Sequence, residues 1–232
     1  MNSFLLQIPI TTDSLSAPVI TEKTLSVIDL ITSGGIGGNL VMGALGLLSI
    51  FAVYILIERF SAIRKASIED DAFLKSIQNF VEAKDIEAAK NLCRNTDSPI
   101  SRMIEKGVNR INKPMTDISA AIENQGKLEV FKMENNLANL ATISGAAPMI
   151  GFLGTVIGMI VAFHEMASAG GNIDVEMLSK GIYTAMTTTV AGLIVGIIAF
   201  IAYNYLVSKV DKVVFMLEAK TTEFLDLLHH NE

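Results

Sequence analysis

The sequence "GIYTAMTTTVAGLIVGIIAFIAYN" (residues 181–204) decides the fold class, because it belongs to a run without a charged residue that extends from Gly181 to Ser208. A helix needs about 20 apolar residues to cross the roughly 30 Å hydrocarbon core of a bilayer. Residues 37–57 and residues 136–163 are two further stretches of this kind. The sequence therefore predicts an all-α membrane protein with three transmembrane helices.

The composition of the chain agrees with this class. Half of the 232 residues are hydrophobic, aromatic residues make up 6%, and tryptophan is absent, which suits helices packed in lipid. The net charge of −6 argues against a nucleic-acid partner, because neutralising phosphates requires clustered Lys and Arg. The single cysteine, Cys93, cannot form an internal disulfide and is predicted to be reduced and without a catalytic or metal-binding role.

Basic residues predict the orientation of the three spans. Lys and Arg near a span tend to remain on the cytoplasmic side, and residues 58–135 hold 13 of the 18 basic residues. The N-terminus is therefore predicted outside and the C-terminus inside. This divides the chain into outer segments at 1–36 and 164–180, a cytoplasmic helical domain at 58–135, and a cytoplasmic C-terminal helix at 209–232.

The polar segment between the first two spans is predicted to be helical, with Asp85 and Ser98 as N-caps. The sequence "NKP" at 112–114 indicates a break. A helix that starts near residue 117 is then expected to run without interruption into the second span. The third span is expected to continue into the C-terminal helix, where an apolar stripe recurs at Val213, Leu217, Phe224 and Leu228.

Each of the last two spans places small and hydroxylated residues on one face when set out at 3.6 residues per turn. "GTVIG" (154–158) and "GLIVG" (192–196) both have the GxxxG spacing that allows helices in lipid to approach closely. One interpretation is that the two faces pack on each other, with threonine hydroxyls bonded to carbonyls of their own helix. The other is that they line a shared cavity in an oligomer, for a partner helix or an ion. The residues concerned are Ser144, Ala147, Pro148, Gly151, Gly154, Thr155, Gly158 and Ala162 in the second span, and Thr184, Thr187, Thr188, Ala191, Gly192 and Ala199 in the third, with Thr189 and Gly196 at the margin of that face.

"LATISGAAPMIGFLGTVIGMIVAF" (140–163), followed by residues 181–204, resembles the MotA/TolQ/ExbB proton-channel family, and most closely its ExbB/TolQ branch. The resemblance implies a homo-oligomeric ring, a pentamer in this family, in the bacterial inner membrane. It further implies a single-span partner of the ExbD or TolR type inside the ring, and a TonB- or TolA-type protein that receives the motion. The small-residue faces would then form the inner wall of the ring, and no cofactor is expected beyond the translocated H+ or Na+.

The family's functional threonines fall on Thr155 in the second span and Thr189 in the third, and its proline falls on Pro148. The family pattern usually begins "GIAEA", with a glutamate in the membrane, whereas this chain has "GIYTA" with Thr184 at that position. A threonine hydroxyl does not titrate at accessible pH, so a proton carrier would have to belong to the partner. Alternatively the ion is sodium, because hydroxyl oxygens suit hard cations. Pore-lining roles are thus expected for Pro148, Thr155, Thr184, Thr188 and Thr189, with Thr155, Thr184 and Thr188 as the sodium ligands in the alternative.

Several other functions are weighed against an ion-driven motor. A TolQ-like role in envelope maintenance and a non-conducting membrane scaffold both remain open. A secondary transporter is disfavoured, because such folds usually need more spans or repeats. An enzyme is disfavoured as well, since "SGGIGGN" (33–39) lacks the Gly-Lys-Ser/Thr of a P-loop and is interpreted as a bend before the first span.

Overall fold

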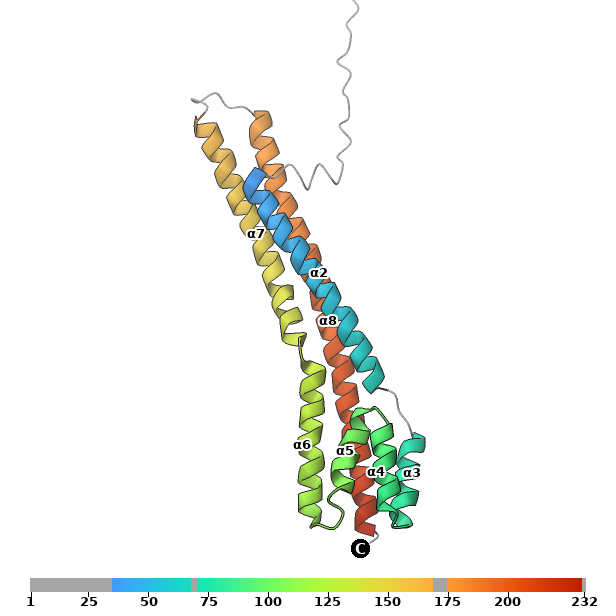
Figure 1. Ribbon diagram of the computed structural model, residues 1–232. Helices are drawn as coiled ribbons and strands as arrows, with labels where there is room; N and C mark the ends of the chain where they lie inside the picture. Colours follow the sequence, from blue (N-terminus) through green and yellow to red (C-terminus); the bar gives the residue numbers. More distant parts are fainter. Residues whose placement is uncertain (1–34, 68–70, 169–174, 231–232) are drawn as a thin grey trace, which may run out of the picture.

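The computed structural model describes residues 35–67, 71–168 and 175–230, and all regular secondary structure in these ranges is α-helical. The three longest helices are α2 (Gly35–Ala66), α7 (Leu137–Ser168) and α8 (Val175–His230), and they run side by side through one half of an elongated molecule (Figure 1). Each belongs to a helical stretch that is long and apolar enough to cross a membrane. The predicted all-helical class with three candidate spans is therefore confirmed.

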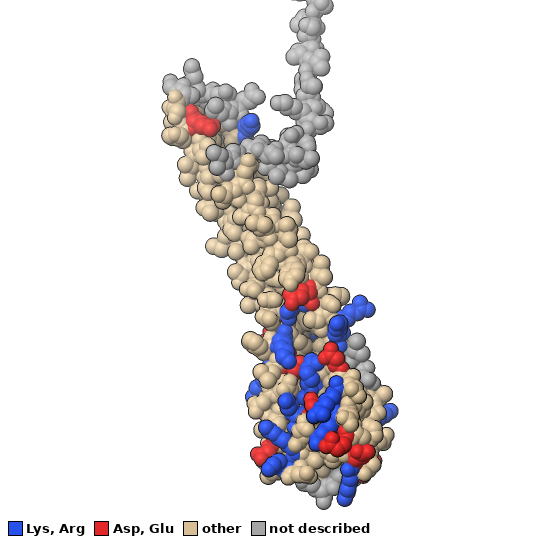
Figure 2. All heavy atoms as spheres, in the orientation of Figure 1, with Lys and Arg blue, Asp and Glu red and all other residues tan. Residues whose placement is uncertain are grey.

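The other half of the molecule is a polar bundle, which we define as helices α3 to α6 together with residues 209–230 of α8. Helix α8 contacts α3, α5 and α6 in this half and α2 and α7 in the other. Figure 2 shows Lys, Arg, Asp and Glu gathered over the bundle, whereas the half that contains the candidate spans is almost free of them. The bundle helices are α3 (Asp71–Glu82), α4 (Ile86–Asn95), α5 (Pro99–Val108) and α6 (Met115–Glu134).

Side chains at two helix starts confirm the predicted caps. The Asp85 carboxylate accepts a hydrogen bond from the Ala88 amide at 3.0 Å, and the Ser98 hydroxyl accepts one from the Ser101 amide at 3.2 Å. Each satisfies an amide that has no partner inside its helix. The apolar stripe expected in the C-terminal part of α8 is also present, since Val213, Leu217, Phe224 and Leu228 are all buried.

The expectation of one unbroken helix from near residue 117 into the second span is wrong. Helix α6 ends at Glu134 and α7 begins at Leu137, because Asn136 has a φ of 64°. Asparagine tolerates this left-handed conformation better than most residues. The Lys132 carbonyl, in the last turn of α6, accepts a hydrogen bond from Arg59 Nη1 of α2 at 2.8 Å. A side chain from the first span thus caps the helix that precedes the second.

Helix boundaries near the other connections also differ from the expectation. Helix α7 continues to Ser168 and α8 begins at Val175, so most of the predicted 164–180 connection is helical, and residues 169–174 lie outside the described part. No glycine or proline interrupts "HEMAS" (164–168), which accounts for the extension. The glycines of "SGGIGGN" belong to α2 from Gly35 onward and do not form a bend. The rest of the predicted 1–36 segment lies outside the described residues.

Cys93 is expected to react slowly with thiol reagents until the bundle unfolds. Burial, followed by the negative charge of Glu105, raises the pKa of its thiol from 9.0 to about 12. The thiolate is the reactive form, so the reactive population at neutral pH is roughly a thousandfold smaller than for an exposed cysteine. Maleimide labelling followed by mass spectrometry should show this protection in the native protein and its loss in denaturant. Rapid labelling of the native protein would contradict the burial of this side chain.

Candidate functional site

The most extensive contact between helices in the candidate spans is that of α7 with α8. A Cβ atom added to Gly192 would lie 2.5 Å from the Ala147 carbonyl oxygen and 2.9 Å from Gly151 Cα. A Cβ atom added to Gly151 would lie 2.7 Å from the Thr188 carbonyl oxygen. All of these neighbours are backbone atoms, which cannot move aside as a side chain can. Glycine is therefore required at both positions for the two helices to lie this close.

The contact continues toward the C-terminal end of α7 and the N-terminal end of α8 through further small residues. A Cβ atom added to Gly158 would lie 2.8 Å from Ala185 Cβ, and one added to Gly154 would overlap the Thr188 side chain. In the other direction along the pair, a Cβ atom added to Gly196 would lie 2.6 Å from Pro148 Cγ. Ala191 faces α2, where it lines a cavity together with Leu45.

The two small-residue faces therefore pack on each other within one chain, which is the simpler of the two interpretations that the sequence left open. Gly151, Gly154, Gly158, Gly192 and Gly196 are all in contact with α7 or α8 of the same chain. Within one chain these glycines are occupied by the α7–α8 contact, and packing of a helix from another protein against this region stays a prediction. The glycines of each helix leave space for backbone or side-chain atoms of the other helix, so one helix pair buries both faces.

The threonine hydroxyls lie against backbone carbonyls. Thr188 Oγ1 is 2.7 Å from the Ala185 oxygen of its own helix and 3.1 Å from the Gly151 oxygen of α7. Thr189 Oγ1 donates to the same Gly151 oxygen at 3.1 Å. Two adjacent hydroxyls of α8 thus meet one carbonyl of α7. Thr155 Oγ1 donates to the Phe152 oxygen at 2.6 Å and Thr184 Oγ1 donates to the Lys180 oxygen at 2.8 Å, both within one helix.

The predicted pathway residues are divided between two sides of the α7–α8 pair. Residues seven apart lie two turns apart on the same side of a helix, so Thr155 shares the side of Pro148, and Thr189 shares the side of Gly196. Since Pro148 packs on Gly196, these four residues form one line along the pair, which we call the open seam. They are half-buried, except for the buried Gly196.

Helix α2 covers the opposite side of the pair. A Cβ atom added to Gly154 would lie 3.0 Å from Val41 of α2, and Ala191 lines the cavity against that helix. Thr184 is seven residues before Ala191 and so shares its side, whereas Thr188 is only 2% exposed between the two helices. Thr184 and Thr188 lie one turn apart on the same face of α8, whereas Thr155 lies on the open seam, so the three proposed sodium ligands are divided between two sides of the pair. The described residues also contain no cluster of three or more His, Cys, Asp or Glu side chains suited to a metal ion.

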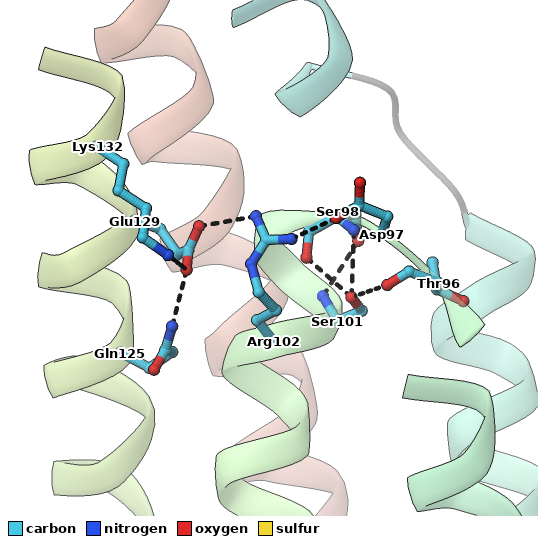
Figure 3. A network of polar contacts seen from close by, with 8 residues as sticks. All are labelled: Thr96, Asp97, Ser98, Ser101, Arg102, Gln125, Glu129 and Lys132. Atoms are coloured by element: carbon cyan, nitrogen blue, oxygen red, sulfur yellow. Dashed lines mark hydrogen bonds and ion pairs between the residues drawn. The ribbon is translucent and has the colours of Figure 1, made fainter. Parts of the chain in front are cut away.

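A second polar site, which the sequence analysis missed, ties the polar bundle together (Figure 3). The Glu129 carboxylate is 2% exposed and accepts hydrogen bonds from Arg102 Nη2 at 2.8 Å, Gln125 Nε2 at 2.8 Å and Lys132 Nζ at 2.9 Å. Burial by itself raises the pKa of this carboxyl, but the hydrogen bonds and charges of Arg102 and Lys132 outweigh that effect and hold the pKa below its usual range. Arg102 also contacts Asp97 at 2.7 Å, so α5 and α6 are joined by one charge network.

A sequence signal for this network exists. Glu129 continues the buried stripe of α6 that includes Ile118, Ile122 and Met133, so an acid occupies an apolar position of an amphipathic helix. A charged group that is buried is almost always paired, and this position therefore indicates a basic partner. The position alone does not identify Arg102, which lies 27 residues away in the sequence.

Residues 95–219 match the MotA/TolQ/ExbB proton channel family, and this range includes both α7 and the apolar part of α8. The chain belongs to this family. An ExbB homolog of Methanothermobacter thermautotrophicus is 28% identical over 187 residues, which are 80% of this chain and 64% of that protein. The Tol-Pal system protein TolQ of Pseudomonas aeruginosa is 25% identical over 91% of this chain and 96% of its own. The biopolymer transport protein ExbB of Helicobacter pylori is 40% identical over 79 residues, which are 34% of this chain and 54% of that protein.

Proposed function

We propose that this chain is the stator-type ion-channel subunit of an inner-membrane motor of the ExbB–ExbD or TolQ–TolR kind. The open seam carries this proposal. Two threonines of adjacent helices, Thr155 and Thr189, lie on it within the apolar stretches of α7 and α8, and α2 covers the opposite side. A proton channel family matches across the same helices.

In the proposed assembly, several copies of the chain, five as in the family, surround the membrane helices of a single-span partner of the ExbD or TolR type. The open seam of each copy faces inward. Neither 137–163 nor 181–208 contains an Asp or Glu, so a carboxylate of the partner carries the proton. The Thr155 and Thr189 hydroxyls supply hydrogen bonds to that carboxylate as it passes. Small residues along the seam let the partner helix turn without striking a large side chain.

Protons are the proposed coupling ion, because the matching family is a proton channel family and Thr155 lies on the open seam, on the other side of the pair from Thr184 and Thr188. The motion would pass to a periplasm-spanning protein of the TonB or TolA type and drive outer-membrane transport. An envelope-maintenance motor is the second candidate, since the similarity to the Pseudomonas TolQ covers 96% of that protein. In either case the N-terminus would be periplasmic and the polar bundle cytoplasmic.

The proposal is tested first by isolating the affinity-tagged chain from membranes of its native host. Mass spectrometry of the purified complex should identify a single-span protein with one aspartate or glutamate in its span. A homo-oligomer that contains no such protein and conducts no ions in proteoliposomes would indicate a scaffold. Sodium coupling would appear as flux that requires sodium and persists without a proton gradient.

Replacing Thr189 or Thr155 by valine is expected to reduce proton flux through the purified complex about 10- to 100-fold. Valine keeps the shape of threonine but removes its hydroxyl, and a hydrogen bond to a charged group contributes about 1.5–3 kcal/mol. Flux is measured in proteoliposomes with a pH-sensitive dye. The matched control is Thr187→Val, because the Thr187 hydroxyl donates to a carbonyl of its own helix, as the Thr155 hydroxyl does, but Thr187 does not lie on the open seam. Equal proton flux in all three variants would show that the open seam is not part of the ion pathway.

A further inference from the structure

A pocket of about 210 Å³ lies between α2 and α8 where the apolar half of the molecule meets the polar bundle. Its walls combine aromatic, aliphatic and basic side chains from the two helices. It is lined by Phe60, Ile63, Arg64, Ser67, Tyr205, Leu206 and Lys209. One water occupies roughly 30 Å³ of liquid, so the pocket can hold a group several times larger than a water molecule.

The position of this pocket corresponds to the headgroup region of a bilayer. Lys209 is the first charged residue after the apolar run of α8, and Arg64 follows the apolar run of α2 by less than two turns. The Phe60 and Tyr205 rings stack with centroids 6.3 Å apart, and Lys209 Nζ lies 5.5 Å from the centroid of the Tyr205 ring. Aromatic rings beside basic side chains are typical of the level at which a span leaves the hydrocarbon.

The two basic residues of the pocket give it a net positive charge. Within the described residues, neither Arg64 nor Lys209 forms an ion pair with a carboxylate, whereas nearby Arg59 pairs with Glu58 at 2.6 Å. Arg59 also donates to the Lys132 carbonyl. Its guanidinium group therefore already has partners that link α2 to α6. Arg64 and Lys209 are therefore available to an anionic ligand.

We propose that this pocket binds the headgroup of an anionic phospholipid. The planar Arg64 guanidinium can pair with two phosphate oxygens, and the Lys209 ammonium adds a second positive charge. The acyl chains would lie along the apolar surface one turn farther into the span, where Ile57 and Ile201 are 64% and 63% exposed. A soluble phosphate would gain nothing from that surface, which favours a lipid as the occupant. The bound lipid would hold α2 against α8 at the membrane boundary.

The binding test uses the full chain purified in detergent and titrated with phosphatidylglycerol, with binding followed by native mass spectrometry. Phosphatidylcholine with the same acyl chains and soluble glycerol phosphate are titrated in parallel. Each basic residue near an anionic membrane contributes roughly fivefold in affinity, so the Arg64→Gln/Lys209→Gln variant should bind phosphatidylglycerol about 25-fold more weakly. The control variant Lys106→Gln/Lys113→Gln loses the same charge at exposed sites of the bundle and should bind normally.

The charge-preserving variant Arg64→Lys/Lys209→Arg separates a loss of binding from a loss of folding, because it should retain most of the affinity. Equal affinity in the two glutamine variants, or equal affinity for phosphatidylglycerol and phosphatidylcholine, would overturn the proposal. Binding of glycerol phosphate as tight as that of the lipid would show a soluble-phosphate site instead. The measurement requires no ion gradient and no partner, so its outcome is independent of the proposed motor function. The expected result is selective phosphatidylglycerol binding that weakens about 25-fold only in Arg64→Gln/Lys209→Gln.

Discussion

Replacing Gly192 by alanine is expected to destabilise the protein by about 3 kcal/mol or more, at or above the upper end of the range for overpacked cores. The added methyl group would lie 2.5 Å from the Ala147 carbonyl oxygen and 2.9 Å from Gly151 Cα. Because both are backbone atoms, α7 and α8 would have to separate along their length. Total stabilities of folded domains are only about 5–15 kcal/mol, so this single methyl group removes a large fraction. Denaturant titration of the helical circular dichroism signal in detergent measures the loss.

Gly145→Ala is the matched control for this substitution. Gly145 also lies inside α7, but a Cβ atom added there meets nothing within 4 Å. Alanine is a better helix former than glycine by roughly 0.5–1 kcal/mol, so this variant should be as stable as the natural chain or slightly more stable. Similar stabilities for Gly192→Ala and Gly145→Ala would mean that the helices are not in close contact at Gly192. In the proposed motor, proton flux should also fall in Gly192→Ala, because the contact sets the spacing between α7, which carries Thr155, and α8, which carries Thr189.

The spans and the caps could be predicted from the sequence because both depend on local patterns. An uncharged run such as 181–208 indicates a membrane helix whatever surrounds it, and Ser98 caps α5 through residues only three positions away. The GxxxG spacings also predicted that α7 and α8 each pack closely against some other helix. They could not say whether the glycines contact the same chain or another, because spacing describes one helix and not its partner.

The break between α6 and α7 was indicated in the sequence only by two turn-forming residues, and the helical pattern on either side of them was stronger. Two consecutive asparagines, Asn135 and Asn136, favour turns and tolerate a left-handed backbone, but they lie between two strongly helical stretches. The structure places Arg59 at this point, where it caps the Lys132 carbonyl. That contact joins residues 73 positions apart, and such long-range partners are not visible in a single sequence. The same limit applies to the pairing of Glu129 with Arg102.

Glu129→Gln is expected to destabilise the polar bundle by about 2–3 kcal/mol at neutral pH. Removing one member of a buried charge pair usually costs about 3–5 kcal/mol, and we place the effect at the lower end because Arg102 and Lys132 remain partly in contact with water. A glutamine would also direct an amide N–H₂ group, a donor, toward groups that can only donate. Chemical denaturation followed by circular dichroism measures the change. Glu123→Gln on the same helix is the control, because Glu123 and its partner Lys127 are both exposed and little change is expected there.

Glu129 also predicts how the bundle responds to acid. Its pKa in the folded protein lies below the usual value of about 4.3, so the folded state binds a proton at this site less readily than the unfolded state does. The stabilisation is therefore complete above the usual pKa, and it is lost as the pH falls through the lowered folded value. Glu129→Gln has no such proton to bind and should lose less stability than the natural chain between neutral and acidic pH. The difference in unfolding free energy between the two proteins should therefore become smaller on acidification. A difference that stays constant from pH 7 to about pH 3 would show that Arg102 and Lys132 do not hold the Glu129 carboxylate in its charged form.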